Sequence, residues 1–227
     1  MGLSEDAFLV GMVAANKGRN PSRKSFQQAF EAFKLFHDTH DDAHLYLHTC
    51  PDPQMADGEN LVRMLKTLDI PLDRVGWANP YKVNFDPYTP TEMAGIYSAM
   101  DVLLNPAMGE GFGIPIVEAQ ACGVPVIVTD CTSMPELVGG GWLVSHRRFW
   151  TGHWSWQFVP EVEDIVDALN KCHAGGLPGR KERGERARQH VLQYDIRKVF
   201  EEHMLPSLRE AEARFADREP VELRAVA

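Results

Sequence analysis

Short apolar runs alternate with helix-like segments over most of the first 144 residues, and this alternation restricts the fold more than any other feature. We expect the runs to be buried strands, and they occupy residues 7–15, 43–49, 81–85, 101–106, 124–130 and 141–144. Between the runs, apolar side chains recur at the spacing of one helix face, as Phe26, Phe30 and Phe33 do. The sequence therefore predicts an α/β, Rossmann-like fold, with a parallel sheet of about six strands and helices on both faces.

The boundaries of this fold are indicated by two changes along the chain. From Glu161 onward the sequence is helical in character, and we expect residues 195–227 to form a C-terminal helix and tail outside a domain of residues 1–194. Residues 145–160 interrupt the alternation and hold three of the five tryptophans. We expect this segment to be an ordered loop whose tryptophans pack against the domain rather than stack on a sugar.

Short motifs predict where two of the helices begin. Thr89 and Glu92 have the spacing of a capping box, in which each of the two side chains accepts a hydrogen bond from the backbone of the other residue. Asn20 and Pro21 fit the N-cap and the first turn of another helix.

Composition and cysteine spacing exclude several classes of protein. A chain of 227 residues with 44% hydrophobic side chains can bury a core, whereas a net charge of -9 argues against a nucleic-acid partner. The four cysteines form no Cys-x-x-Cys pair, which favours reduced thiols over a disulfide framework or a zinc site. No segment approaches the roughly 18 apolar residues of a membrane-spanning helix, and the start, MGLSEDAF, lacks a signal-peptide pattern. We therefore expect a cytoplasmic protein without a transmembrane segment.

The most informative motif is MGEGFGIPIVEAQACGVPVIV, which runs from Met108 to Val128 and follows the expected strand 101–106. In an open parallel sheet, ligands bind outside the carboxyl ends of the strands. The glycines of this turn allow the backbone to approach a ligand closely, and the helix that follows presents unpaired N–H groups to a phosphate. Pro115 falls in the first turn of that helix, where its missing N–H costs little.

Glu110 and Glu118 flank this turn, and their carboxylates do not suit a phosphate. A carboxylate at the start of a helix is often only a complement to the helix dipole, and Gly-x-Gly alone is a weak signal. Carboxylates beside a phosphate site would repel the phosphate unless they bind something else. Sugar hydroxyls are suitable partners, because an ionised carboxylate accepts hydrogen bonds from two neighbouring hydroxyls. The stretch therefore indicates a site for a ligand with both phosphates and sugar rings, such as a nucleotide sugar.

The whole arrangement, E-G-F-G-x-P-x-x-E-A-x-A-C-G-x-P-V, resembles the C-terminal donor-binding domain of GT-B-fold, retaining glycosyltransferases of glycosyltransferase family 4 (group 1). Glu110 and Glu118 match the E-x7-E signature of that family. The neighbouring residues 111–113 and 121–126 match as well, and MPELV at residues 134–138 resembles the family's P-E-[IL]-V turn. The resemblance covers roughly residues 7–170.

The resemblance implies a role for each matched position. Glu110 would contact hydroxyls of the transferred sugar, and Glu118 would hold the ribose hydroxyls. The diphosphate and the sugar would meet the backbone amides of Gly111, Phe112, Gly113 and Ile114.

The family also places an arginine and a lysine after its first strand, against the diphosphate. Here the corresponding loop is NKGRNPSRKSF, from Asn16 to Phe26. Lys24 matches the lysine best. Arg19 has the usual spacing from it, but the loop is longer than usual, so Arg23 or Lys17 are alternatives for the arginine. From the residues alone, the loop is either a solvated basic surface or an anion site, and its place at a strand end favours the anion site.

Retaining transfer of a hexose from a nucleotide-diphosphate sugar to an unknown acceptor is the activity that the resemblance implies. No Asp-x-Asp cluster is evident, so we expect no metal and no cofactor besides the donor. Full GT-B enzymes have a second, N-terminal half, and we expect this chain to be inactive without such a half or a partner chain. The alternatives are a non-catalytic nucleotide-sugar-binding module and a GT-B-like epimerase or phosphorylase. A dinucleotide oxidoreductase is disfavoured, because the first strand and turn do not spell G-x-G-x-x-G.

Overall fold

The computed structural model describes residues 2–18, 21–53, 57–152 and 154–216. The chain divides into two compact units, of which the first ends at Val191 and the second begins at Leu192. Each unit is described by itself.

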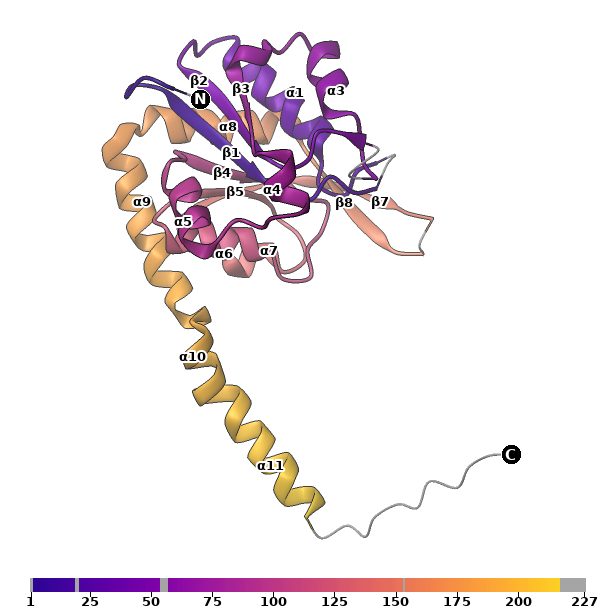
Figure 1. The fold of residues 1–227 in the computed structure, drawn as a ribbon, viewed down its shortest axis with the longest axis vertical. Coiled ribbons are helices and arrows are strands. Elements are labelled where there is room, and N and C mark those ends of the chain that lie inside the picture. The colour runs from indigo at the N-terminus through magenta and orange to yellow at the C-terminus, as the bar shows by residue number, and fades with distance from the viewer. Residues whose placement is uncertain (1, 19–20, 54–56, 153, 217–227) are drawn as a thin grey trace. The chain divides into compact units, whose positions relative to one another are not determined.

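A six-stranded sheet with the strand order β3-β2-β1-β4-β5-β6 forms the centre of the first unit (Figure 1). All neighbouring strands in it are parallel. The strands are β1 (Phe8–Val13), β2 (Ala43–His48), β3 (Val75–Trp77), β4 (Val102–Asn105), β5 (Val126–Thr129) and β6 (Gly141–Val144). The predicted α/β, Rossmann-like fold is thereby confirmed.

Helices cover both faces of the sheet (Figure 1). One face is covered by α1 (Phe26–His37), α3 (Leu61–Thr67) and α8 (Val162–Ala174). The other face is covered by α5 (Pro90–Ser98), α6 (Ile114–Ala121) and α7 (Met134–Leu137), and α9 (Gly176–Val191) packs on α6. The short helix α4 (Pro80–Asn84) follows β3, which a single 3-10 turn, Leu72–Arg74, precedes.

The core lies between the sheet and α1, where aromatic side chains dominate. Phe26, Phe30, Phe33 and Phe36 of α1 are all fully buried. Burial of a phenylalanine side chain contributes about 1.5–3 kcal/mol, so this helix face accounts for much of the stability of the unit. On the opposite face of the sheet, Gly11 leaves room for Met100, whose sulfur would lie 2.1 Å from a Cβ at that position.

The segment 81–85, which we expected to be a strand, is helical instead. It belongs to α4 (Pro80–Asn84), and the third strand is the earlier β3. Local capping explains the difference. The Asn79 side chain accepts a hydrogen bond from the Tyr81 N–H, and Pro80 occupies the first turn, where a proline is favourable.

Of the two predicted helix starts, one is confirmed and one is wrong. Thr89 and Glu92 form the complete capping box of α5. The helix expected to begin after Asn20 and Pro21 begins at Phe26, with Ser25 at its N-cap. Asn20 itself lies outside the described residues.

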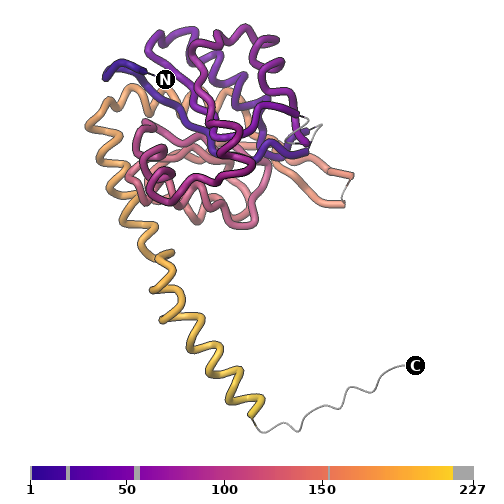
Figure 2. Tube along the Cα trace, in the orientation of Figure 1, coloured from indigo at the N-terminus to yellow at the C-terminus, as the bar shows by residue number. Residues whose placement is uncertain are grey.

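Residues 145–160 contain a β-hairpin rather than a packed loop. Strands β7 (His146–Trp150) and β8 (Trp156–Pro160) pair antiparallel in a sheet of their own, and the hairpin extends away from the central sheet (Figures 1 and 2). Trp150, Trp154 and Trp156 are 48%, 84% and 50% exposed, so the expectation that they pack against the domain is wrong. Trp150 and Trp156 form a cross-strand pair with ring centroids 5.0 Å apart, and a two-stranded ribbon offers them little else to pack on.

The second unit is helical. Its described residues form a 3-10 turn (Leu192–Tyr194), α10 (Ile196–Val199), a π-helical turn (Phe200–Met204) and α11 (Leu205–Phe215). Ile196, Phe200, Met204 and Leu208 recur at every fourth position and are exposed. No helix among the described residues of either unit has the length and apolar character needed to cross a membrane.

The capping box of α5 yields a prediction about acid stability. The ion pair with Lys82, together with the hydrogen bonds from the Thr89 backbone and hydroxyl, holds the pKa of Glu92 at about 2, below its ordinary value of 4.5. A carboxyl with a depressed folded-state pKa stabilises the fold above its unfolded pKa, and this contribution is lost as the pH falls towards the folded pKa. We expect Glu92→Gln to lower the melting temperature at pH 7, and the gap to wild type to shrink as the pH falls from about 4.5 towards 2. Circular dichroism melts at pH 7, 5, 4 and 3 measure this gap, and a gap of constant size would contradict the assignment.

Candidate functional site

The site lies where the order of the strands reverses. From β1 the chain continues outward to β2 and β3, whereas from β4 it continues in the opposite direction to β5 and β6. The loops that leave the carboxyl ends of two such strands diverge and open a crevice, which is the usual ligand site of this architecture. Here the loop after β1 holds Arg23 and Lys24, and the loop after β4 holds Glu110. The two loops are joined by a backbone hydrogen bond of 2.8 Å from the Met108 N–H to the Arg23 carbonyl.

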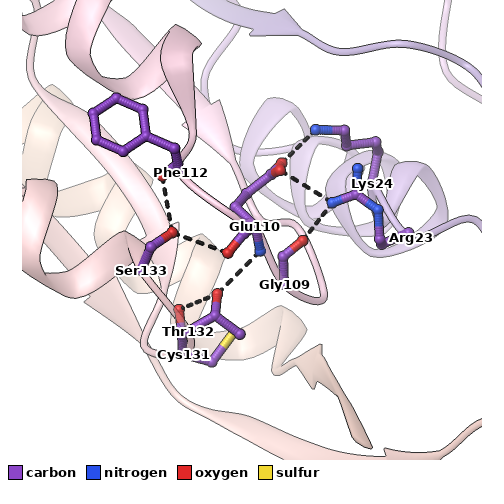
Figure 3. Close-up of polar contacts among 8 residues, drawn as sticks. All are labelled: Arg23, Lys24, Gly109, Glu110, Phe112, Cys131, Thr132 and Ser133. Atoms are coloured by element: carbon purple, nitrogen blue, oxygen red, sulfur yellow. Dashed lines mark hydrogen bonds and ion pairs between the residues drawn. The ribbon is translucent and has the colours of Figure 1, made fainter. Parts of the chain in front are cut away.

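Three charged side chains from these two loops meet in the crevice (Figure 3). One oxygen of the Glu110 carboxylate pairs with the Lys24 ammonium group, and the other lies 3.1 Å from Nη1 of Arg23. The Arg23 guanidinium also donates to the carbonyl of Gly109. Lys24 and Glu110 are nearly buried, with 13% and 10% of their side chains exposed, while Arg23 is 44% exposed. The structure therefore brings together three of the residues predicted for the site.

A third loop, which follows β5, holds the glycine-rich turn in place (Figure 3). Oγ1 of Thr132 accepts a hydrogen bond of 3.0 Å from the Glu110 N–H. Oγ of Ser133 donates to the carbonyls of Glu110 and Phe112, at 3.0 and 2.9 Å. These contacts fix the backbone on both sides of Gly111. Sequence reasoning singled out neither residue, although both precede the MPELV turn.

Gly113 ends the turn and begins α6. Its φ of 102° belongs to the region that side chains rarely adopt, and a Cβ there would lie 2.9 Å from Cδ1 of Ile116. Pro115 lies in the first turn of α6, as predicted. Glycine is therefore needed at residue 113 for the chain to turn from the loop into the helix.

Glu118 lies one turn further along α6 and is exposed. The Tyr97 hydroxyl donates a hydrogen bond of 2.7 Å to Oε2 of this carboxylate. Burial, the bond to Glu118 and its negative charge all raise the pKa of Tyr97 above its ordinary value. The hydroxyl therefore stays protonated and remains a donor.

A cavity of about 720 Å³ opens beside these residues. Among the described residues, the charged ones that line it are all cations, namely Lys17, Arg23, Lys24 and Lys82. Glu110 borders the cavity through its contacts with two of these cations, whereas Glu118 follows the lining residue Pro115 by one helical turn. Arg19 lies outside the described residues, so the geometry concerns the alternatives Arg23 and Lys17, which both line the cavity.

The cavity also has lining residues that the sequence did not indicate, among them His48, Thr49 and Tyr88. Burial lowers the pKa of His48, so its ring is neutral at pH 7 and can accept or donate a hydrogen bond. Oγ1 of Thr49 is buried and has no hydrogen-bond partner among the described residues. His48 is the last residue of β2, and Thr49 follows it. The rule that ligands bind at the carboxyl ends of strands could therefore have indicated both residues from the sequence.

Other chemistry is not supported by the described part of the chain. Within it, no three histidine, cysteine, aspartate or glutamate side chains gather as metal ligands would. Burial raises the pKa of the Cys131 thiol, which lies beside the glycine-rich turn, to about 11, so this thiol is protonated at neutral pH and is a poor nucleophile. The expectation of a metal-independent site stays a prediction.

Comparison with known proteins gives one family and one fold. Residues 10–174 match the family described as glycosyl transferases group 1. A curated relative, the D-inositol 3-phosphate glycosyltransferase of Corynebacterium jeikeium, is 32% identical over 141 residues, which are 62% of this chain and 32% of the relative.

Two solved structures show the same fold. Sucrose-phosphate synthase from Thermosynechococcus elongatus has a TM-score of 0.71 and 22% identity over 93% of this chain and 47% of its own. Anabaena Alr3699/HepE in complex with UDP-glucose has a TM-score of 0.64 and 17% identity over 90% of this chain and 49% of its own. The chain thus spans about half the length of these structures and about a third of the curated relative.

The turn at Gly113 yields a prediction about stability. We expect Gly113→Ala to lower the free energy of unfolding by about 1–2 kcal/mol, because a side chain is strained at this positive φ and would crowd Ile116. Gly111→Ala is the matched control, since a Cβ at residue 111 meets nothing within 4 Å, and it should change stability by less than about 0.5 kcal/mol. Urea unfolding of both variants measures the difference, and equal losses would show that the conformation of Gly113 is not the cause.

Proposed function

Because the chain belongs to the glycosyl transferases group 1 family, we propose that its crevice binds a nucleotide-diphosphate sugar as the donor for glycosyl transfer. The observation that carries this proposal is the charge of the cavity. In a chain with a net charge of -9, the four charged residues that line the cavity within the described part of the chain are all cations. Three of them pair with Glu110 or Glu92, and the four cations and two carboxylates together leave a positive excess. Such a lining attracts an anion of high charge, and a diphosphate is the anion that a nucleotide sugar supplies.

The carboxylates at the border of the cavity fit the sugar-bearing parts of the same ligand. Glu110 is held by Lys24 and Arg23, and an incoming diphosphate competes with it for these two cations. Glu110 then loses its contact with a cation and instead accepts hydrogen bonds from hydroxyls of the transferred sugar. An ionised carboxylate is a strong acceptor for such hydroxyls. Glu118 accepts from the ribose hydroxyls at the other end of the diphosphate. The resemblance of the E-x7-E motif supports both assignments. The UDP-glucose complex of the structural neighbour HepE supports the class of ligand.

In the proposed transfer, the bond between the sugar and the diphosphate breaks while positive charge develops on the sugar ring. Lys24, Arg23 and the N-terminus of α6 stabilise the negative charge that builds up on the departing diphosphate. Glu110 orients the sugar. We propose a retaining outcome and a hexose donor, in keeping with glycosyltransferase family 4, without a metal ion or any cofactor besides the donor. This site would stabilise the leaving group electrostatically and position the donor. We propose that the groups that bind the acceptor belong to another domain or to a partner chain.

The first prediction from this proposal concerns Lys24. We expect Lys24→Ala to weaken binding of a nucleoside diphosphate such as UDP, because a hydrogen bond to a charged group is worth about 1.5–3 kcal/mol, or roughly tenfold or more in affinity. Lys34→Ala is the matched control, because Lys34 pairs with Asp38 on the surface of α1. Isothermal titration calorimetry measures both affinities. An unchanged affinity for Lys24→Ala would assign the diphosphate contact to Arg23, Arg19 or Lys17 instead.

The second prediction separates the two glutamates. Glu118, which we place at the ribose, contacts a part common to the nucleotide and the nucleotide sugar, so Glu118→Gln should weaken both by roughly tenfold or more. Glu110, which we place at the transferred sugar, should matter for the nucleotide sugar and hardly for the free diphosphate. Paired titrations of UDP and UDP-glucose against Glu110→Gln and Glu118→Gln measure this division.

The outcome that contradicts the division is an equal loss of UDP affinity in both variants. If both variants stay folded and lose no affinity for either ligand, the two glutamates have a structural role only, and the proposed function is wrong for this site.

A further inference from the structure

The contact between Tyr97 and Glu118 joins a buried donor to an exposed acceptor. Tyr97 belongs to α5 and is 1% exposed, while Glu118 belongs to α6 and is exposed. The hydroxyl donates across the helix pair to Oε2 of the carboxylate, at 2.7 Å. Among the described residues, Tyr97 is the one hydrogen-bond partner that the structure gives to this carboxylate. One carboxylate oxygen is thus held by the protein core, and the other is left for a ligand.

The same two helices also line the cavity. Met93 of α5 and Pro115 of α6 both belong to the lining. Tyr97 follows Met93 by four residues and Glu118 follows Pro115 by three, so each lies on the same helix face as its lining residue, one turn further along. The hydrogen bond therefore joins the two helices one helical turn away from residues that line the cavity.

An exposed glutamate samples several rotamers, and a ligand that uses it must restrict them. For a flexible side chain, this restriction lowers the affinity roughly two- to tenfold. A hydrogen bond to a rigid, buried donor removes part of the cost before the ligand arrives. Tyr97 is well suited to this task, because its ring is immobilised by the core and its raised pKa keeps the hydroxyl a donor.

We propose that Tyr97 is a positioning residue, which holds the Glu118 carboxylate in the orientation that accepts the two ribose hydroxyls of the donor nucleotide. The inference rests on the proposed function and adds to it a residue outside the E-x7-E motif. Tyr97 itself does not touch the ligand. Its effect passes through Glu118 and concerns binding of the ribose, so it should be absent where Glu118 is absent.

A double-mutant cycle tests this inference. The variants are Tyr97→Phe, Glu118→Ala and the double variant, and calorimetry gives their affinities for whichever of UDP, GDP and ADP the wild type binds most tightly and for its 2′-deoxy counterpart. Tyr97→Phe keeps the buried ring and removes only the hydroxyl, so the fold should persist, which a thermal melt checks. We expect Tyr97→Phe to weaken binding of the ribonucleotide roughly two- to tenfold, the range that corresponds to ordering one side chain.

Two further readouts distinguish positioning from a merely structural role. The preference of the wild type for the ribonucleotide over the deoxynucleotide should shrink in Tyr97→Phe, and Tyr97→Phe should have no further effect in the Glu118→Ala background. Equal weakening of both nucleotides, or additive effects of the two substitutions, would overturn the inference.

The cycle also separates this inference from the proposed function. If Glu118→Ala weakens ribonucleotide binding and Tyr97→Phe does not, the inference is wrong while the proposed function stands. If the wild type binds none of the three nucleotides, the proposed function is wrong and the inference falls with it.

Discussion

The parallel pairing of β1 with β4 is the constraint on which the rest of the site depends. Val10 and Gly11 of β1 lie opposite Val102 and Leu103 of β4, and the strand order reverses at this pair. The pairing leaves the basic loop and the glycine-rich turn at the same edge of the sheet, although about 86 residues separate Lys24 from Glu110 in the sequence. Any ligand that binds in the crevice at the carboxyl ends of β1 and β4 contacts both loops.

The ion pairs in this crevice contribute little to the stability of the fold, and their arrangement fits the proposed binding of a diphosphate better. Exposed ion pairs contribute about 0–1 kcal/mol, and Arg23, at 44% exposed, belongs to that class. With Glu110 held by two cations, the three side chains together carry one net positive charge, and each oxygen of the nearly buried carboxylate has a cationic partner. In the proposed function, a diphosphate that displaces Glu110 would therefore meet cations that are already positioned, and the carboxylate would be released beside the proposed place of the sugar.

The sequence predicted the elements that carry a clear apolar or capping pattern and missed two segments in which composition is misleading. Burial of apolar runs on both faces gave the parallel sheet, and the Thr89–Glu92 spacing gave the start of α5. Residues 81–85 have strand-like composition, yet Asn79 and Pro80 cap them as a helix, so the local turn prevails over composition. The tryptophans of residues 145–160 were expected to pack on the domain because large apolar side chains are usually buried. A hairpin with its own hydrogen-bond ladder carries them outward instead.

For the site, the motif pointed to the charged residues that we propose face a ligand, but not to the residues that support them. Glu110 and Glu118 stand out because they flank a glycine-rich turn, and Lys24 stands out because it belongs to a cluster of cations between the first strand and the first helix. Ser133 and Tyr97 have no such signal, because their roles arise from contacts between elements distant in sequence: 23 residues separate Ser133 from Glu110, and 21 separate Tyr97 from Glu118. From the sequence, a tyrosine on the buried face of α5 is predicted to be a core residue without any role in the site. The packing of α5 against α6 brings the Tyr97 hydroxyl to a carboxylate at the surface. The residues that support the proposed site therefore include buried ones that lie outside the motif.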